Sequence, residues 1–268
     1  MGQIGRVIRA STGLLLLASA AGAQGAKPLA KCAPNAVVSG TVCMDKYEAS
    51  VWRVEDPTGL NRKLVKKIQR GRATLDNLLK VADQLGSGGD YGACTDEGQN
   101  CAEIFAVSLA GVPPSANTTW FQAQQACKNS RKRLPTSAEW QAAVAGTPDT
   151  VDDNTSTRCN TATAAHVEPA GFRSTCVSFD GAFDMVGNLR EWVADWVPRS
   201  TTCGAWTNPI SPTDDQCLAG ASGDAMDEPG ALLRGGGFSD GTKAGPFTID
   251  GRTEPSSSGA DIGFRCVR

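Results

Sequence analysis

Cysteine is the residue type whose number and spacing say most about the chemistry of this chain. Ten cysteines occur among 268 residues, at Cys32, Cys43, Cys94, Cys101, Cys127, Cys159, Cys176, Cys203, Cys217 and Cys266. No C-x-x-C spacing occurs, which argues against a zinc site built from thiolates. The even number predicts disulfides instead. The close pairs are Cys32–Cys43, Cys94–Cys101, Cys159–Cys176 and Cys203–Cys217, which leaves Cys127 and Cys266 for a long-range bridge.

Ser239 in "GFSDG" matches the G-x-S-x-G pattern of a hydrolase nucleophile. That turn requires a helix directly after it and a histidine later in the chain. Pro246 follows, and the single histidine, His166, lies upstream, so we reject a serine hydrolase. One histidine also excludes a three-histidine metal centre, and we interpret His166 as a surface residue. Gly235 to Gly237 precede no G-K-[ST], which excludes a P-loop.

The stretch "DMVGNLREW" (184–192) contains oxygen donors around a predicted tight turn. Asp184 and Glu191 supply carboxylates, and Gly187 lets backbone carbonyls turn inward. Oxygen ligands from a flexible loop suit calcium. The alternative is a capped turn that holds no ion.

The N-terminus predicts export. Basic residues, a short apolar run and "AGA" at 21–23 are typical of a signal peptide, assigned to 1–23 and followed by a tail at 24–35. No other segment is apolar enough to span a membrane. A net charge of −2 gives no field that would gather nucleic acid or an anionic membrane. The segment 62–82 is locally basic, which indicates either a binding surface or a solvated helix face.

Local patterns predict few regular elements. A hairpin is expected around Ser39-Gly40, and apolar spacing predicts a helix within 62–82 that is interrupted at Gly71. Two capping boxes, Thr119 with Gln122 and Thr136 with Glu139, predict two short helices. From 147 onwards the chain is rich in loop residues.

Five ordered motifs carry a family resemblance: "CMDKYEAS" (43–50), "KRLPTSAEW" (132–140), "FDMVGNLREW" (183–192), "LLRGGGF" (232–238) and "DIGFRCVR" (261–268). Together they resemble the formylglycine-generating enzyme family, also called the sulfatase-modifying factor family. The resemblance covers 36–268, with 53–105 as a divergent insertion. It implies an α+β fold like that of a C-type lectin, loop-rich, with a small twisted sheet and few helices.

The resemblance also implies particular contacts. It pairs Cys127 with Cys266 and makes Arg234 to Phe238 a core strand whose glycines permit close packing. It implies a calcium site at Asp184, Val186, Gly187, Leu189 and Glu191. A second calcium site would begin at Asn160 and Thr161, without a clear match for its later ligands.

The chemistry of the family is where this chain departs from it. Family enzymes oxidise a sulfatase cysteine to formylglycine with oxygen and with copper held by two cysteines, and soft thiolates suit Cu(I). The matching positions here are Asp240 and Gly245, so the resemblance predicts calcium and argues against copper. Arg234, Arg252 and Arg265 are expected near the same cleft, where buried ion pairing is the commoner role for arginine.

The sequence therefore predicts an exported, lectin-like module that binds a protein, peptide or glycan. The first alternative is an enzyme of the same family that works in this cleft, either as an oxidoreductase or through Asp240, Arg252 or Arg265. The second alternative is a purely structural protein. Whether the chain is an enzyme is left open at this point.

Overall fold

A computed structural model describes Gly2 and residues 31–88, 90–149, 153–206, 211, 213–223 and 228–268. The predicted signal peptide, Gly2 excepted, and most of the predicted tail lie outside the described residues. Among the described residues, no helix combines the length and the apolar character needed to cross a bilayer.

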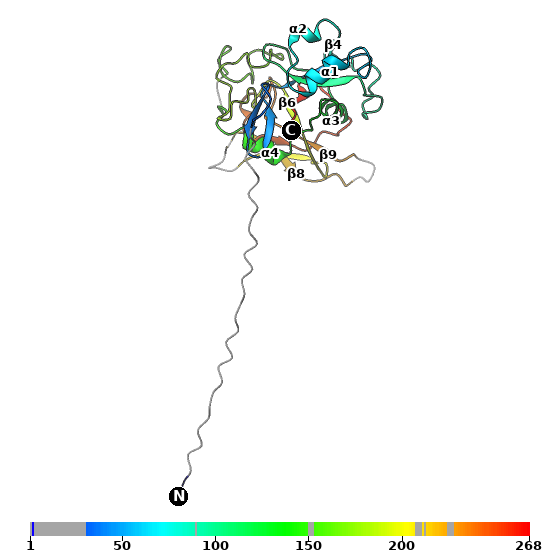
Figure 1. The fold of residues 1–268 in the computed structure, drawn as a ribbon. Coiled ribbons are helices and arrows are strands. Elements are labelled where there is room, and N and C mark those ends of the chain that lie inside the picture. Colours follow the sequence, from blue (N-terminus) through cyan, green and yellow to red (C-terminus); the bar gives the residue numbers. More distant parts are fainter. Residues whose placement is uncertain are drawn as a thin grey trace.

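The strands of the described chain form three sheets (Figure 1). A hairpin pairs β1 (Ala36–Ser39) with β2 (Val42–Asp45), as predicted. A three-stranded sheet has the order β4 (Asp83–Leu85), β3 (Ala49–Arg53), β5 (Ile104–Ser108). The largest sheet has the order β11 (Ile262–Phe264), β6 (Arg190–Val197), β9 (Gly230–Arg234), β10 (Ile249–Asp250), β8 (Asp215–Ala219), β7 (Thr202–Ala205).

The helices are short, and two of them begin at the predicted capping boxes. In chain order the helices are α1 (Arg62–Gln69), α2 (Leu75–Leu78), α3 (Trp120–Asn129), α4 (Ser137–Ala143) and the 3-10 turn η1 (Gly241–Lys243). Both predicted capping boxes form, because Thr119 and Thr136 each accept from the backbone three residues on. Gly71 has φ +63° and ends the first helical segment, since only glycine adopts this conformation at low cost.

Apolar side chains from helices and sheets meet in a buried core. Trp192 and Phe264 pack beside the Cys127–Cys266 disulfide, which joins α3 to the C-terminal end of the chain. Trp140 of α4 is fully buried beneath β6 and β9. These contacts fix β6 and β9, the two strands from which the site residues project.

The three consecutive glycines lie after a strand and not within one. Strand β9 ends at Arg234, so the predicted strand from Arg234 to Phe238 is wrong. Gly235 and Gly236 have φ +83° and +77°, which turns the chain out of the sheet. Close packing is nevertheless correct, because a Cβ on Gly235 would lie 2.7 Å from the Met185 carbonyl oxygen.

All ten cysteines form the five predicted disulfides: Cys32–Cys43, Cys94–Cys101, Cys127–Cys266, Cys159–Cys176 and Cys203–Cys217. Several of them close short loops that contain little regular structure. A framework of this kind is typical of proteins that fold in an oxidising compartment.

Candidate functional site

Strand β6 supplies residues to two different environments. Successive side chains of a strand point to opposite faces, so Arg190 and Glu191 face away from each other. Glu191 is buried in the interior, whereas Arg190 lines a cavity beside η1. The strand therefore joins a buried carboxylate cluster to an open cleft.

The carboxylate cluster consists of Glu48, Asp184 and Glu191, and one guanidinium, that of Arg265, lies among them. All four side chains are buried. Burial, with the nearby carboxylates of Asp184 and Glu191, raises the pKa of Glu48 well above its usual range. Burial also raises the pKa of Asp184 to about 7. Three carboxylates facing one guanidinium leave an excess of negative charge, which favours either protonation or a bound cation.

Glu191 is saturated by neighbours within the protein. Arg265 donates from Nε to both Glu191 oxygens, at 2.9 and 2.8 Å, and from Nη2 at 2.5 Å. Trp140 Nε1 donates to Glu191 Oε2 at 2.7 Å. Arg265 therefore lies in the core beside Glu191 and does not line the cleft, contrary to the sequence-based expectation. Its role is the buried ion pair that the sequence analysis gave as the commoner one.

Asp184 begins the turn that was predicted to bind calcium. Asp184, Gly187 and Asn188 have φ of +56°, +73° and +58°, so the backbone reverses sharply here. Gly171 N donates to Asp184 Oδ2 at 2.6 Å, while Asp184 Oδ1 accepts no hydrogen bond from the described part of the chain. An unpaired carboxylate oxygen beside excess negative charge fits a hard cation such as calcium.

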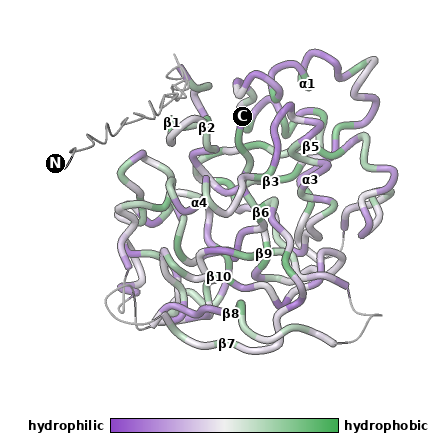
Figure 2. Tube along the Cα trace, turned by 90° about the horizontal axis from the view of Figure 1, so that it is seen from below, coloured by the Kyte–Doolittle hydropathy of each residue, from purple (hydrophilic) through white to green (hydrophobic). Residues whose placement is uncertain are grey.

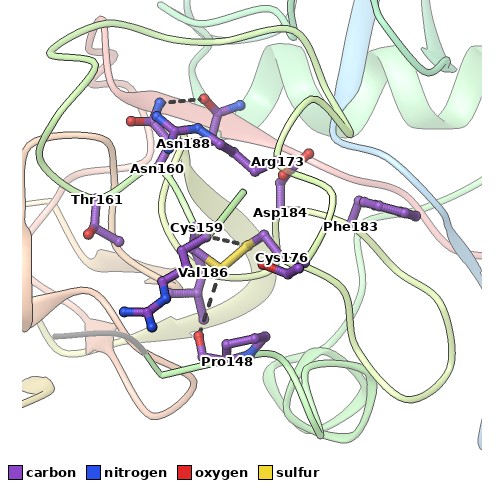
Figure 3. Close-up of a disulfide and its surroundings, with 12 residues drawn as sticks. Pro148, Cys159, Asn160, Thr161, Arg173, Cys176, Phe183, Asp184, Val186 and Asn188 are labelled. Atoms are coloured by element: carbon purple, nitrogen blue, oxygen red, sulfur yellow. Dashed lines mark hydrogen bonds between the residues drawn. A yellow bond between two sulfur atoms is a disulfide. The ribbon is translucent and has the colours of Figure 1, made fainter. Parts of the chain in front are cut away.

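Asn160 lies against this turn (Figure 3). Its Nδ2 donates to Asn188 Oδ1 at 3.1 Å and to the His166 carbonyl oxygen at 3.0 Å. Its Oδ1 is buried without a hydrogen-bond partner. The imidazole of His166 is exposed, as predicted, and only its backbone takes part in this contact.

A buried arginine crosses the loop that carries Asn160 and Thr161. Arg173 pairs with Asp153 at 2.8 Å and with Glu168 at 2.5 Å. Asp153 in turn accepts from Thr161 N at 3.1 Å. A protein cation thus already neutralises the carboxylates of this loop. The residues fit one calcium ion at the Asp184 turn better than a second ion at Asn160 and Thr161.

The cleft lies over β9 and β10, beside η1, and has a volume of about 150 Å³. Its walls carry four basic and three acidic side chains. The lining residues are Arg190, Asp215, Leu233, Arg234, Gly236, Asp240, Lys243, Thr248, Asp250 and Arg252. Three of the four predicted cleft residues, Arg234, Asp240 and Arg252, therefore come together. The fourth, Gly245, is buried and is not one of the lining residues.

Ion pairs arrange the charged groups of the cleft. Arg252 donates to Asp250 at 2.7 Å. Arg190 pairs with Asp261 and lies 3.5 Å from Asp240. Asp240 also accepts from Gly237 N at 2.9 Å, which fixes the turn after the glycines.

Arg234 forms the floor of the cleft. Its guanidinium lies 4.6 Å from the Trp140 ring centroid and donates to Gln141. Burial lowers the pKa of Arg234 to about 10, so the group stays charged near neutral pH. Arg234 Nε is buried without a hydrogen-bond partner.

Position 245 has no room for a side chain. A Cβ placed on Gly245 would lie 2.2 Å from Asp214 Oδ1 and 2.3 Å from Oδ2. That carboxylate is held by Ser211 Oγ at 2.8 Å and by Phe247 N at 2.8 Å. Burial raises the pKa of Asp214. Asp214 thus occupies the space into which a residue 245 side chain would project.

Three residues of these sites are not predicted from the sequence patterns: Glu48, Arg190 and Asp214. Glu48 lies inside a quoted motif, but only the fold brings it to Asn188, which donates to Glu48 at 2.5 Å. Arg190 was detectable, since it alternates with Glu191 along one strand. Asp214 lies in an irregular stretch of sequence, where no motif or spacing indicates that it would lie beside Gly245.

Comparison with known proteins gives the family. The sulfatase-modifying factor enzyme 1-like domain matches residues 67–268. The chain belongs to this family. A formylglycine-generating enzyme from Streptomyces coelicolor is 28% identical over 175 residues, which cover 58% of this chain and 52% of the relative. The match thus spans about half the length of that relative.

Solved structures give a more distant likeness. The P3c variant of the major tropism determinant covers 87% of this chain and 52% of its own, at 16% identity and a TM-score of 0.46. PvdO from Pseudomonas aeruginosa covers 87% of this chain and 82% of its own, at 18% identity and a TM-score of 0.40. The predicted family is confirmed, and the sheets and short helices of the described chain confirm the predicted α+β, loop-rich fold.

Proposed function

We propose that this protein is an exported family member that binds a ligand in the cleft and does not generate formylglycine. The export pattern of residues 1–23 and the five disulfides support secretion to a periplasm or to the outside of the cell. The cleft between η1 and β10 is the proposed ligand site.

The observation that carries the proposal is the pair of positions where family oxidases hold copper. Asp240 offers a hard carboxylate, and a side chain at Gly245 would have to displace the Asp214 carboxylate, because its Cβ would lie 2.2 Å from Asp214 Oδ1. All ten cysteines are bound in disulfides, so no free thiol is available elsewhere. The groups on which copper oxidase chemistry depends are therefore missing from this chain.

The cleft is small and strongly charged, which limits what can enter it. A volume of about 150 Å³ is well below the roughly 300–1,000 Å³ of pockets that enclose a drug-sized ligand. One charged side chain or the edge of one sugar fits such a space. We therefore expect a protein, peptide or glycan that inserts a single polar group between Arg252 and Asp240.

Calcium is part of the proposal as a structural cation. Asp184, with the backbone carbonyls of Val186, Gly187 and Leu189, would hold it. Glu191 is engaged with Arg265 and would contribute mainly negative charge. Calcium would neutralise the excess charge of the cluster and fix the turn that leads into β6.

A family enzyme with other chemistry in the same cleft is the second candidate. Asp240 and Arg252 are charged and partly accessible there. This candidate requires turnover of a peptide or small molecule that depends on Asp240. Binding without turnover favours the first candidate.

The test is a ligand screen on glycan and peptide arrays with the wild-type chain and two variants. Asp240→Asn removes a cleft charge at nearly constant size. Arg133→Gln, a matched control, removes a half-exposed charge that pairs with Glu139 outside the cleft. We expect a ligand whose affinity falls at least about tenfold with Asp240→Asn, the usual loss for a charged hydrogen bond, and is unchanged with Arg133→Gln. Ligands that bind both variants like the wild type would contradict the cleft assignment.

A further inference from the structure

A strongly basic surface lies at the far end of the molecule from the cleft. Figure 1 shows α1 and α2 at the top of the view and β8 and β9 at the bottom. Helix α1 buries Leu64, Val65 and Ile68 against the core. Its opposite face and the two residues Arg70 and Arg72 beyond its end expose six basic side chains. We call these the basic surface: Arg62, Lys63, Lys66, Lys67, Arg70 and Arg72.

The charge of the basic surface is not balanced within the described chain. None of the six side chains forms an ion pair with the residues that the structure describes. Five of them line one shallow hollow. Like charges three and four residues apart on a helix repel each other. Residues 60–81 contain seven basic residues and one acidic residue, although the whole chain has a net charge of −2.

Apolar side chains protrude from the same segment. Leu60 is 88% exposed, Leu79 65% and Val81 46%. With Leu75 they make up four of the nine large apolar side chains that are exposed among the described residues. Lys67 Nζ donates to Asn77 Oδ1 at 3.0 Å, which holds α2 against the basic surface.

We propose that the basic surface docks on a bilayer containing anionic phospholipid. Phosphate groups would lie between the basic side chains, and Leu60 and Leu79 would enter the interface beside them. A protein that binds at a membrane surface combines basic side chains, which contact the lipid phosphates, with neighbouring apolar side chains, which enter the headgroup region. An acidic polysaccharide would use the charges but would gain nothing from protruding leucines. This contact is independent of the cleft and of its ligand.

The experiment measures co-sedimentation with phosphatidylcholine vesicles that contain or lack phosphatidylglycerol. We expect partition into the phosphatidylglycerol vesicles only, and its loss as NaCl rises from about 0.05 to about 0.5 M, because salt screens surface charge. Lys63→Gln with Lys66→Gln should lower partition by about 25-fold, or about fivefold for each charge. Arg133→Gln with Arg158→Gln removes the same net charge at exposed positions outside both the basic surface and the cleft, and should leave partition unchanged.

Leu60→Ser with Leu79→Ser separates lipid from polysaccharide. Both side chains are exposed, so the fold should be retained, and circular dichroism of each variant verifies this. We expect weaker vesicle binding and unchanged heparin binding by this variant. The proposal is overturned if the wild type ignores phosphatidylglycerol, if the control pair loses as much binding as the lysine pair, or if the serine variant binds vesicles like the wild type.

Discussion

Replacing Arg265 by methionine tests the buried ion pair that joins β6 to the C-terminal strand. Arg265 is fully buried and donates to Glu191 and to the carbonyl oxygens of Asp45, Phe183 and Asp184. Methionine has a comparable length but no charge. The variant would leave three buried carboxylates without a cation and three carbonyl oxygens without this donor.

The expected loss follows from that environment. Removing one partner of a buried ion pair costs about 3–5 kcal/mol, since the remaining charge stays desolvated. A domain of this kind has a total stability of about 5–15 kcal/mol, so the loss is a large fraction of it. The double variant Glu191→Gln/Arg265→Met removes both charges, and we expect it to recover about 2 kcal/mol.

Urea unfolding with the disulfides intact provides the measurement. Trp140 and Trp192 are buried, so their fluorescence reports loss of the core. The titrations are run in EDTA, which keeps calcium from neutralising the buried carboxylates that have lost their guanidinium partner. A loss below about 1 kcal/mol for Arg265→Met, the range of exposed pairs, or a double variant less stable than the single one, would refute this account of the cluster.

Three further predictions concern calcium, packing and pH. Burial raises the pKa of Asp184 from 3.8 to about 7. Between these two values the metal-free folded state holds a proton that the unfolded state has released. The free energy of unfolding in EDTA should therefore fall as the pH rises from 3.8 to about 7. Calcium binds the ionised form, so its effect on the thermal midpoint should be larger at about pH 8 than at about pH 5; equal effects at both values would count against Asp184 as a ligand. Gly245→Ala should cost about 1–3 kcal/mol through overpacking, whereas Gly204→Ala, where a Cβ meets nothing within 4 Å, should cost little in the same urea titration. The hydrogen bond from Arg133 lowers the pKa of Glu139 from 4.5. Glu139→Gln should therefore lose under about 1 kcal/mol of unfolding free energy at neutral pH, and none below the folded-state pKa, where the wild type has already lost this contribution. A stability difference that persists in acid would exclude the pairing.

Local patterns predicted local structure well, because the interactions involved lie within a few residues. The two capping boxes, the break at Gly71 and the turn around Ser39-Gly40 all formed. The short sequence spacings of four cysteine pairs predicted their disulfides, and Cys127 and Cys266 were then the two cysteines left to pair. Figure 2 shows the outcome of the apolar pattern, with hydrophobic segments along the inner strands and hydrophilic ones along α1.

The arrangement of the sites depended on contacts between distant residues. Arg265 pairs with Glu191, which lies 74 residues away, and no spacing indicates this. The glycines after Arg234 were read as a strand because close packing and positive φ both require glycine. Asp214, which fills the space beside Gly245, lies in a segment whose apolar residues show no helical or strand periodicity.

The central claim, that the cleft no longer supports formylglycine formation, is tested most directly by one assay. The purified chain, with copper and oxygen, is incubated with a peptide containing the sulfatase cysteine, beside an active formylglycine-generating enzyme, and the peptide is examined by mass spectrometry. We expect the cysteine to stay unmodified with this chain and to be converted by the active enzyme. Copper-dependent appearance of the aldehyde with this chain would contradict it.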